Sequence, residues 1–344
     1  MSRGLVGELV RLGWPMLIAQ LAVMANSVID TIMAGRYGTL DLAAVGIGSS
    51  IYFSVFVALM GVLLALTPIV AHMHGAGEHA EIGEELRQSV WLAVALTLVA
   101  VALFAYPEPF LAVAKVEPAL EAKVRAYLHA LAWSLPAALL FRVFYSFSTA
   151  ISRPRTVMAL TLIGLALKVP LNWVFMYGNL GAPELGSTGC AVATTLIAWI
   201  TSVLAWAWCW FEPGYRPYRV FARWSWPNAK ALGRILSLGL PIGLTFFIDV
   251  TGFTFMALFI ARLGALYSAA HQIASNLAAL AFMLPLALGN AASVEVGQSL
   301  GARQPARARA AGITGLALAL ACAAVSGAGL YWFADGIAGL YAGD

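Results

Sequence analysis

The sequence predicts an all-α, polytopic membrane protein with two parallel-repeat helical lobes, and three observations support this fold class. Of 344 residues, 61% are hydrophobic and only 10% are charged, whereas a soluble domain carries about 25% charged residues. The apolar runs exceed the roughly 20 residues that cross a bilayer core as a helix, and they lack the alternation of barrel strands. Finally, the first part of the chain recurs later at one constant offset.

The apolar runs predict nine transmembrane helices. Residues 1–34 lack the short apolar core and small-residue cleavage site of a signal peptide, so the first span is expected to be retained. Several spans are longer than a bilayer requires and contain Pro or Gly, which predicts tilts or kinks. The predicted spans are 10–34, 42–72, 88–107, 124–151, 156–177, 186–211, 232–262, 266–298 and 308–334.

Basic residues are divided unequally between the two ends of these spans. With the N-terminus placed in the cytoplasm, thirteen of the 20 Lys and Arg fall on the cytoplasmic side, as the positive-inside rule expects. The net charge of +4 therefore reflects the topology of a multi-pass inner-membrane protein, with lipid headgroups as partners and not nucleic acid. Arg142 and Lys168 lie within spans, and five basic residues fall on the opposite side: Arg36, Lys115, Lys123, Arg125 and Arg262.

An internal repeat organises the chain. Leu12-Gly13-Trp14-Pro15 recurs as Leu238-Gly239-Leu240-Pro241, an offset of 226, and Gly75-Ala76 matches Gly301-Ala302 at the same offset. Six spans precede residue 226, an even number, so both copies enter the membrane in the same orientation. This predicts a parallel repeat about an axis along the membrane normal.

The repeat divides the chain into two predicted lobes. The N-terminal lobe covers 1–211 with six helices, a cytoplasmic linker covers 212–231, and the C-terminal lobe covers 232–344 with three helices. The second copy has 118 residues against 226 in the first. We therefore expect the second lobe to be incomplete and the sequence to be C-terminally truncated by three helices.

Two carboxylates are the leading functional candidates, because ionisable groups at bilayer depth are costly unless they face a cavity or a partner. Asp30 lies deep in the first span, with Asn26 one turn earlier on the same face. The alternative interpretation is that Asp30 only helps to terminate its helix. Asp249 lies within the seventh span without a local cationic partner. We predict that both are cation-coupling groups, one per lobe, which bind a proton or a small cation in turn.

Other polar residues are predicted to line a cavity or bind substrate. Lys168 and Asn172 lie four residues apart on one face of the fifth span, on either side of Pro170, which is expected to kink the helix. Lys168 is predicted either to pair with Asp30 across the first lobe or to extend to the lipid interface. Asn26 and Gln272, the latter in the eighth span, complete this set.

Cysteine and histidine spacing predicts neither a metal site nor a disulfide. Cys190, Cys209 and Cys322 lie within spans at unrelated spacings. His72-Met73-His74 has the pattern of two metal ligands, but no carboxylate or Cys cluster accompanies it in sequence. We therefore expect no cofactor apart from a coupling ion, H⁺ or Na⁺.

Four stretches of the sequence together point to a family. They are Trp14-Pro15, IDTIMAG at 29–35, LALTPIVA at 64–71 and VPLNWVFMYG at 169–178. The chain resembles the multidrug and toxic compound extrusion (MATE) family, and among its members the bacterial NorM-type exporters. The resemblance implies twelve helices in two lobes around a central cavity, in a bacterial inner membrane, with drugs exported in exchange for inward H⁺ or Na⁺.

The resemblance also assigns roles to single positions. Asp30 matches the acidic residue of the family's first helix, and Asn172 matches a polar position in the fifth. Asp249 stands where NorM-type members usually carry Glu, and Lys168 where many members carry Asn, so a built-in cation is expected to neutralise Asp30. The family's tenth-helix carboxylate would lie beyond Asp344, and we therefore expect the cation site of this chain to be incomplete.

Two competing functions make different demands on the sequence. A lipid-linked precursor or polysaccharide flippase of the same two-lobe plan needs several cations to hold a pyrophosphate. Only Arg142 and Lys168 lie within spans, against Asp30 and Asp249, which favours cationic or zwitterionic drugs as cargo. An intramembrane enzyme needs a nucleophile–base pair, a His-rich metal cluster or a phosphate-cradling loop, and the sequence contains none. We expect a monomeric transporter that is not an enzyme.

Overall fold

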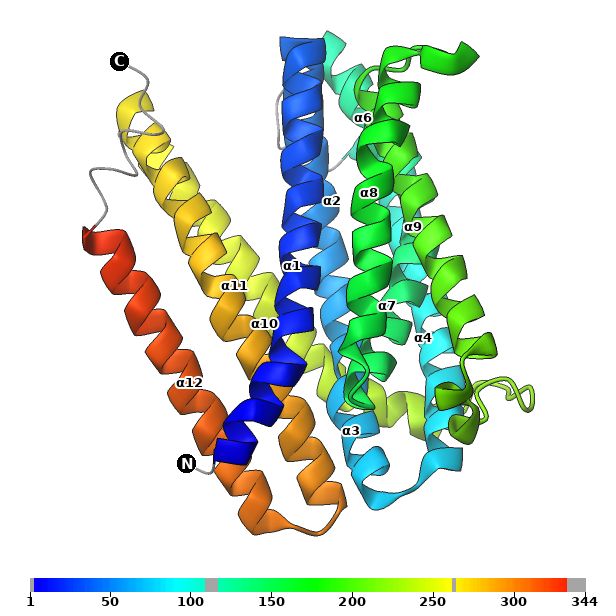
Figure 1. Ribbon diagram of the computed structural model, residues 1–344. Helices are drawn as coiled ribbons and strands as arrows, with labels where there is room; N and C mark the ends of the chain where they lie inside the picture. Colours follow the sequence, from blue (N-terminus) through cyan, green and yellow to red (C-terminus); the bar gives the residue numbers. More distant parts are fainter. Residues whose placement is uncertain (1–2, 109–116, 262–263, 333–344) are drawn as a thin grey trace.

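The structure, a computed structural model, describes residues 3–108, 117–261 and 264–332, and the elements in these ranges are helices (Figure 1). The long helices are α1 (Arg3–Tyr37), α2 (Thr39–Leu64), α3 (Leu66–Ala76), α4 (His79–Ala105), α6 (Pro118–Ala132), α7 (Leu135–Ala150), α8 (Pro154–Tyr177), α9 (Ser187–Phe211), α10 (Ala229–Ala261), α11 (Ala265–Gly301) and α12 (Pro305–Trp332). Two short 3₁₀ helices, η1 (Asn179–Gly181) and η2 (Pro213–Tyr218), lie in loops.

The described helices confirm the predicted spans. Eight helical segments are long and apolar enough to cross a membrane, and the bent pair α6–α7 makes a ninth. The two interrupted spans contain a proline four residues after the last helical residue. Pro68 follows Leu64 of α2, and Pro136 follows Ala132 of α6. Proline has no N–H to donate to the carbonyl four residues earlier, which weakens the helix at these two positions. Helices α6 and α7 meet at 47°.

The helix boundaries confirm the repeat. Helix α2 begins at Thr39 and α11 at Ala265, while α4 begins at His79 and α12 at Pro305. Both pairs of starting residues are 226 positions apart, the offset seen in the sequence. We refer to α1–α9 as the first half and to α10–α12 as the second half. The predicted lobe boundaries, with a linker at 212–231, stay a prediction.

Reciprocal contacts at the interface show how the two halves are related. Gly75 of α3 packs so closely on the backbone of Gln298 in α11 that no Cβ would fit. Gly301 of α11 meets the backbone of His72 in α3 in the same way. His72 and Gln298 are also 226 positions apart. A contact and its converse between equivalent positions indicate a pseudo-two-fold axis between the halves.

A second reciprocal pair lies further along the interface. Gly13 of α1 faces the side chain of Leu288 in α11, and Gly239 of α10 lies against the backbone of Val62 in α2. These positions are again related by the offset of 226. The halves therefore pack as two parallel copies, with small residues allowing the helices to approach closely, as is common between membrane helices.

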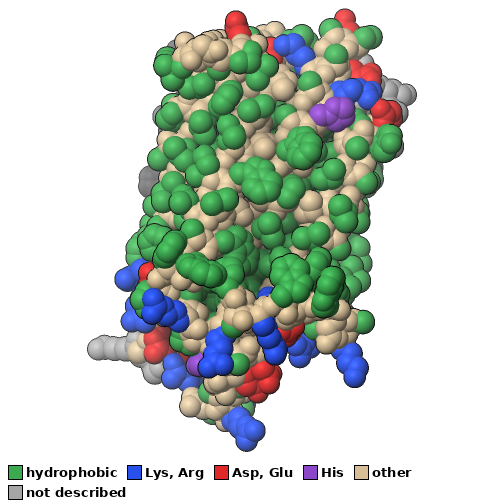
Figure 2. Space-filling view, turned by 90° about the vertical axis from the view of Figure 1, so that its right-hand side faces the viewer, with side chains coloured by type: hydrophobic (Ala, Val, Ile, Leu, Met, Phe, Trp, Pro, Cys, Tyr) green, Lys and Arg blue, Asp and Glu red, His purple; other side chains and the backbone are tan. Residues whose placement is uncertain are grey.

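The surface has the zones that a bilayer selects. Figure 2 shows a band of hydrophobic side chains between two charged ends, with Lys and Arg gathered at the lower end. In Figure 1, α11 and α12 diverge from α1 and α8 toward the upper end, which is opposite the end rich in Lys and Arg.

The segment that connects the two halves packs on α4. Arg87 Nε donates to Ser225 Oγ at 3.0 Å, and Trp91 Nε1 donates to the Ser225 carbonyl at 2.9 Å. The halves are thus held together at the basic end.

Candidate functional site

Three helices of the first half bring four polar side chains together, with Asp30 among them. The Oδ2 atom of Asp30 in α1 lies 2.8 Å from Lys168 Nζ in α8, and Oδ1 accepts a hydrogen bond of 2.8 Å from Asn172 Nδ2. Lys168 Nζ also donates to Thr194 Oγ1 in α9 at 2.6 Å. We refer to Asp30, Lys168, Asn172 and Thr194 as the Asp30 cluster.

The local sequence explains this geometry. Lys168 and Asn172 lie one turn apart in α8, so both face α1. Gly164, one turn before Lys168, lies against the methyl groups of Ile197 and Thr201, which lets α8 and α9 approach closely. Pro170 lies within α8 without ending it. The packing therefore brings the ammonium within reach of both neighbouring helices.

The Asp30 cluster is shielded from solvent. The Lys168 side chain is 2% exposed and that of Asp30 is 14% exposed, and Asn172 is fully buried. A buried charge is tolerated when it is paired and hydrogen-bonded. Here one carboxylate and one ammonium cancel in net charge, while the Asn172 Oδ1 atom is buried without a hydrogen-bond partner among the described residues.

The structure confirms one of the two contacts predicted for Lys168. The ion pair with Asp30 is present, and extension to the lipid interface is wrong because Lys168 is buried. Asn26 is not part of the cluster: its Nδ2 donates to the Ala22 carbonyl of its own helix at 3.1 Å, and its Oδ1 is buried without a partner in the described ranges. Asn26 makes no hydrogen bond to Asp30 among the described residues, and its predicted role in lining a cavity stays a prediction.

Asp249 and Gln272 lie apart from the Asp30 cluster. Asp249 is exposed on α10 and makes no hydrogen bond or ion pair with another described residue. Gln272 is exposed on α11, and among the described residues its side chain has one long contact, of 3.5 Å, to Asn276. In the repeat, Asp30 corresponds to Met256 and Asp249 to Val23. The two carboxylates therefore do not occupy equivalent positions of the repeat, and the role predicted for Asp249 stays a prediction.

Thr194 is the member of the cluster that sequence reasoning missed. It lies in the apolar span of α9, where its Oγ1 also donates to the Cys190 carbonyl at 2.9 Å. In the sequence, Thr194 could have been recognised only as a hydroxyl in an apolar run. That pattern does not distinguish a site residue from a structural one, because Thr commonly hydrogen-bonds to its own helix. Arg142, the other basic residue within a span, lies 4.3 Å from the centre of the Tyr145 ring, a cation–π contact.

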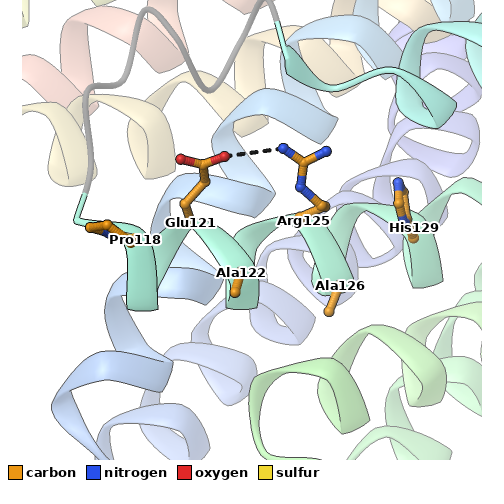
Figure 3. A pocket seen from close by; sticks show the side chains of 6 residues that line it. All are labelled: Pro118, Glu121, Ala122, Arg125, Ala126 and His129. Atoms are coloured by element: carbon orange, nitrogen blue, oxygen red, sulfur yellow. Dashed lines mark hydrogen bonds and ion pairs between the residues drawn. The ribbon is translucent and has the colours of Figure 1, made fainter.

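A separate hollow of about 410 Å³ opens on α6. Figure 3 shows the side chains that line it, with Arg125 Nη2 and Glu121 Oε1 joined at 3.0 Å. The lining comes from one helix (Pro118, Glu121, Ala122, Arg125, Ala126 and His129) and includes no member of the Asp30 cluster. In the described ranges no three His, Cys, Asp or Glu side chains form a group that could hold a metal ion.

These features define a class: a polytopic α-helical membrane protein with a repeated bundle and a buried charge cluster. The MatE family model matches residues 15–174 and 241–344. The chain therefore belongs to the MATE family, whose members are transporters and not enzymes.

Curated relatives cover almost the whole chain. It is 44% identical over 340 residues to the probable multidrug resistance protein NorM of Aromatoleum aromaticum, a match that spans 99% of this chain and 73% of that protein. It is 39% identical over 350 residues to the multidrug resistance protein PmpM of Pseudomonas aeruginosa, spanning 100% and 73%. The relationship to NorM-type proteins extends through both halves.

Solved structures share the fold. The chain is similar to a MATE transporter, NorM-NG, in complex with rhodamine 6G and a monobody, with a TM-score of 0.74 and 34% identity over 89% of this chain and 66% of that one. It also matches a MATE family transporter in an outward-facing conformation, with a TM-score of 0.86 and 20% identity over 97% and 73%. The second likeness concerns the fold alone.

Proposed function

We propose that this protein exports small-molecule drugs across a bacterial inner membrane by exchanging them for H⁺ or Na⁺. The observation that carries the proposal is the buried Asp30 cluster within the spans of a MATE family chain, because an intramembrane carboxylate marks an ion or substrate pathway. The relatives NorM and PmpM are multidrug resistance proteins. The NorM-NG structure holds rhodamine 6G, which supports a drug as cargo.

Asp30 and Asp249 are the groups to which we assign coupling. Asp30 is paired and shielded, whereas Asp249 is exposed and unpaired among the described residues. In an exchanger, the cation and the drug must bind preferentially to different conformational states of the protein, or they must compete for one site. Two carboxylates in unlike environments, one in each half, provide two places where such competition can occur.

Alternating access would require the halves to separate at the basic end. Arg307 Nη2 of α12 lies 3.0 Å from Glu8 Oε2 of α1, and Arg234 of α10 pairs with Glu85 of α4. By the positive-inside rule this end, with the N-terminus, faces the cytoplasm. The conformation described here would then be closed toward the cytoplasm, and these ion pairs would break in the alternative state.

The charge balance within the spans supports cationic or zwitterionic cargo over a lipid-linked pyrophosphate, and we propose that the transporter acts as a monomer. Lys168 is neutralised by Asp30. Of the two basic residues assigned to the interior of spans, Arg142 is therefore the one without a carboxylate partner among the described residues. A single guanidinium provides too few donors to hold a pyrophosphate. The exposed Asp249 carboxylate would attract a cationic drug.

The proposal is tested with Asp249→Asn in cells that lack their own major efflux pumps. We expect wild-type protein to lower ethidium and norfloxacin accumulation, and the variant to lose at least about tenfold in efflux rate, since a 1.4 kcal/mol interaction corresponds to a factor of about ten. Glu81→Gln, the same carboxylate-to-amide change at an exposed position in the first turn of α4, serves as the control for expression and folding. Efflux and ion dependence that are unchanged in Asp249→Asn would exclude Asp249 as a coupling group.

A further inference from the structure

Asp30 already binds a cation that belongs to the chain. Its Oδ2 faces Lys168 Nζ at 2.8 Å, and its Oδ1 accepts from Asn172 Nδ2 at 2.8 Å. A metal cation would bind this carboxylate through the same oxygen lone pairs. Such a cation therefore cannot reach Asp30 unless the Lys168 ammonium first leaves.

Lys168 is held firmly in this position. Its side chain is 2% exposed, and Nζ makes a second hydrogen bond, of 2.6 Å, to Thr194 Oγ1. Because the ammonium is tethered to α8, it competes for Asp30 intramolecularly, at a high effective concentration that a free ion must overcome.

A proton differs from a metal ion at this site. It needs no coordination shell and no volume of its own, and an ionised carboxylate offers about four lone-pair positions. Lys168 and Asn172 each interact with one oxygen of the Asp30 carboxylate, which leaves a position for a proton. The side chain is 14% exposed, so part of the carboxylate remains accessible to a small proton donor.

We propose that Lys168 determines ion specificity in the first half: its ammonium occupies the metal-cation position at Asp30, so that Asp30 exchanges protons and excludes Na⁺. This inference deepens the proposed function, because it rests on an exchange mechanism and names the ion that one of its two sites accepts. It concerns Asp30 alone and makes no claim about Asp249.

The test measures ²²Na⁺ binding to the purified protein in detergent at fixed pH. Wild type and Asp30→Asn are expected to bind the same amount of ²²Na⁺. Lys168→Asn is expected to bind one additional equivalent per chain, which the double variant with Asp30→Asn loses again. Lys168→Arg keeps a cation beside Asp30 and is expected to behave as wild type.

A second measurement follows stability, since a bound ligand raises the melting temperature of the state that binds it. Replacing choline chloride by NaCl should raise the melting temperature of Lys168→Asn above any shift seen in wild type. If Lys168→Asn does not fold, Lys168→Gln takes its place. The proposal is overturned by wild-type ²²Na⁺ binding that Asp30→Asn removes, or by a folded neutral variant that gains no Na⁺ binding.

A third experiment measures the protons released when a drug binds. It distinguishes a failure of this inference from a failure of the proposed function. Adding ethidium to wild type in weakly buffered solution should release protons, and Asp30→Asn should reduce that release. Ethidium binding without any difference in proton release between the two proteins would overturn the proton assignment. Failure of ethidium to bind either protein would count against the proposed function, whereas the ²²Na⁺ result would still decide whether Lys168 excludes Na⁺.

Discussion

Asn172 is a neutral member of the Asp30 cluster, and its contacts show how one uncharged side chain stabilises a buried charge. Its Nδ2 donates to Asp30 at 2.8 Å, while its own side chain is fully buried. Hydrogen bonds to charged groups contribute about 1.5–3 kcal/mol each to stability. Asn172 therefore complements Lys168, which supplies the charge, by satisfying the second carboxylate oxygen.

We predict that Asn172→Ala lowers the free energy of unfolding by about 2 kcal/mol, because one oxygen of a shielded carboxylate loses its donor. Thermal denaturation in detergent measures the change. Asn179→Ala is the matched control: its Nδ2 donates to the Trp173 carbonyl at 2.9 Å in an exposed loop. A shift for Asn172→Ala no larger than that of Asn179→Ala would contradict the stabilising role.

At the scale of elements, one carboxylate joins three helices at the end opposite the basic one. Asp41 of α2 accepts hydrogen bonds from Lys123 Nζ of α6 at 2.7 and 2.8 Å, and from the backbone N–H of Ser187, the first residue of α9, at 2.8 Å. A carboxylate is favourable at a helix N-terminus, where backbone N–H groups lack partners. Asp41 thus anchors the start of α9.

Asp41→Ala is expected to destabilise the protein by about 2 kcal/mol, because it removes a cap and a charge partner together. Asp41→Asn should cost about 1 kcal/mol, since an amide oxygen can still accept from Ser187. Both are measured by thermal denaturation, with Glu81→Gln on exposed helix surface as the control. Equal losses for the two Asp41 variants would show that the cap contributes nothing beyond the ion pair.

Because α3 and α11 cross closely, we expect two glycine-to-alanine substitutions within α11 to have different effects on stability. Gly301→Ala places a Cβ against the His72 backbone and should cost about 1–3 kcal/mol, as overpacking does. Gly289→Ala, in the same helix with nothing within 4 Å of the added Cβ, should be neutral or slightly stabilising through helix propensity. Melting temperatures of the two variants in detergent compare them, and a similar loss in both would refute close packing at Gly301.

For the whole molecule, the question is whether the halves separate at the basic end. Gln298 Nε2 of α11 donates to Ser152 Oγ at 2.9 Å and to the Ala150 carbonyl at 2.7 Å. Together with the pairs Arg307–Glu8 and Arg234–Glu85, these contacts join the second half to the first. A rocking motion of one repeat against the other has to break them.

We predict that a disulfide between Ser152→Cys and Gln298→Cys stops ethidium efflux, because it holds the basic end closed. Oxidation followed by reduction should abolish efflux and then restore it, measured in membrane vesicles. The single variants Ser152→Cys and Gln298→Cys, treated in the same way, control for oxidation of the native cysteines. Full efflux by a fully cross-linked protein would show that transport does not require separation at this end.

Much of the architecture was accessible from the sequence, whereas only part of the site was. Hydropathy located nine spans, and the offset of 226 predicted the repeat that the helix starts of the second half then followed. Of the candidate site residues, Asp30, Lys168 and Asn172 come together. Asn26 bonds to its own helix instead, and Asp249 remains exposed. Register along one helix predicts which side chains share a face, but not which neighbouring helix that face meets.

The sequence by itself determined the class of protein, the order of its spans and its two-fold repeat, because hydropathy and periodicity are properties of contiguous residues. Only the tertiary structure decided which polar groups meet within the membrane. Asn172 and Asp30 are 142 residues apart, and Thr194 is 26 residues from Lys168. Their contacts depend on the rotation and close packing of α1, α8 and α9. That packing converts a carboxylate at bilayer depth into a shielded pair with its own cation.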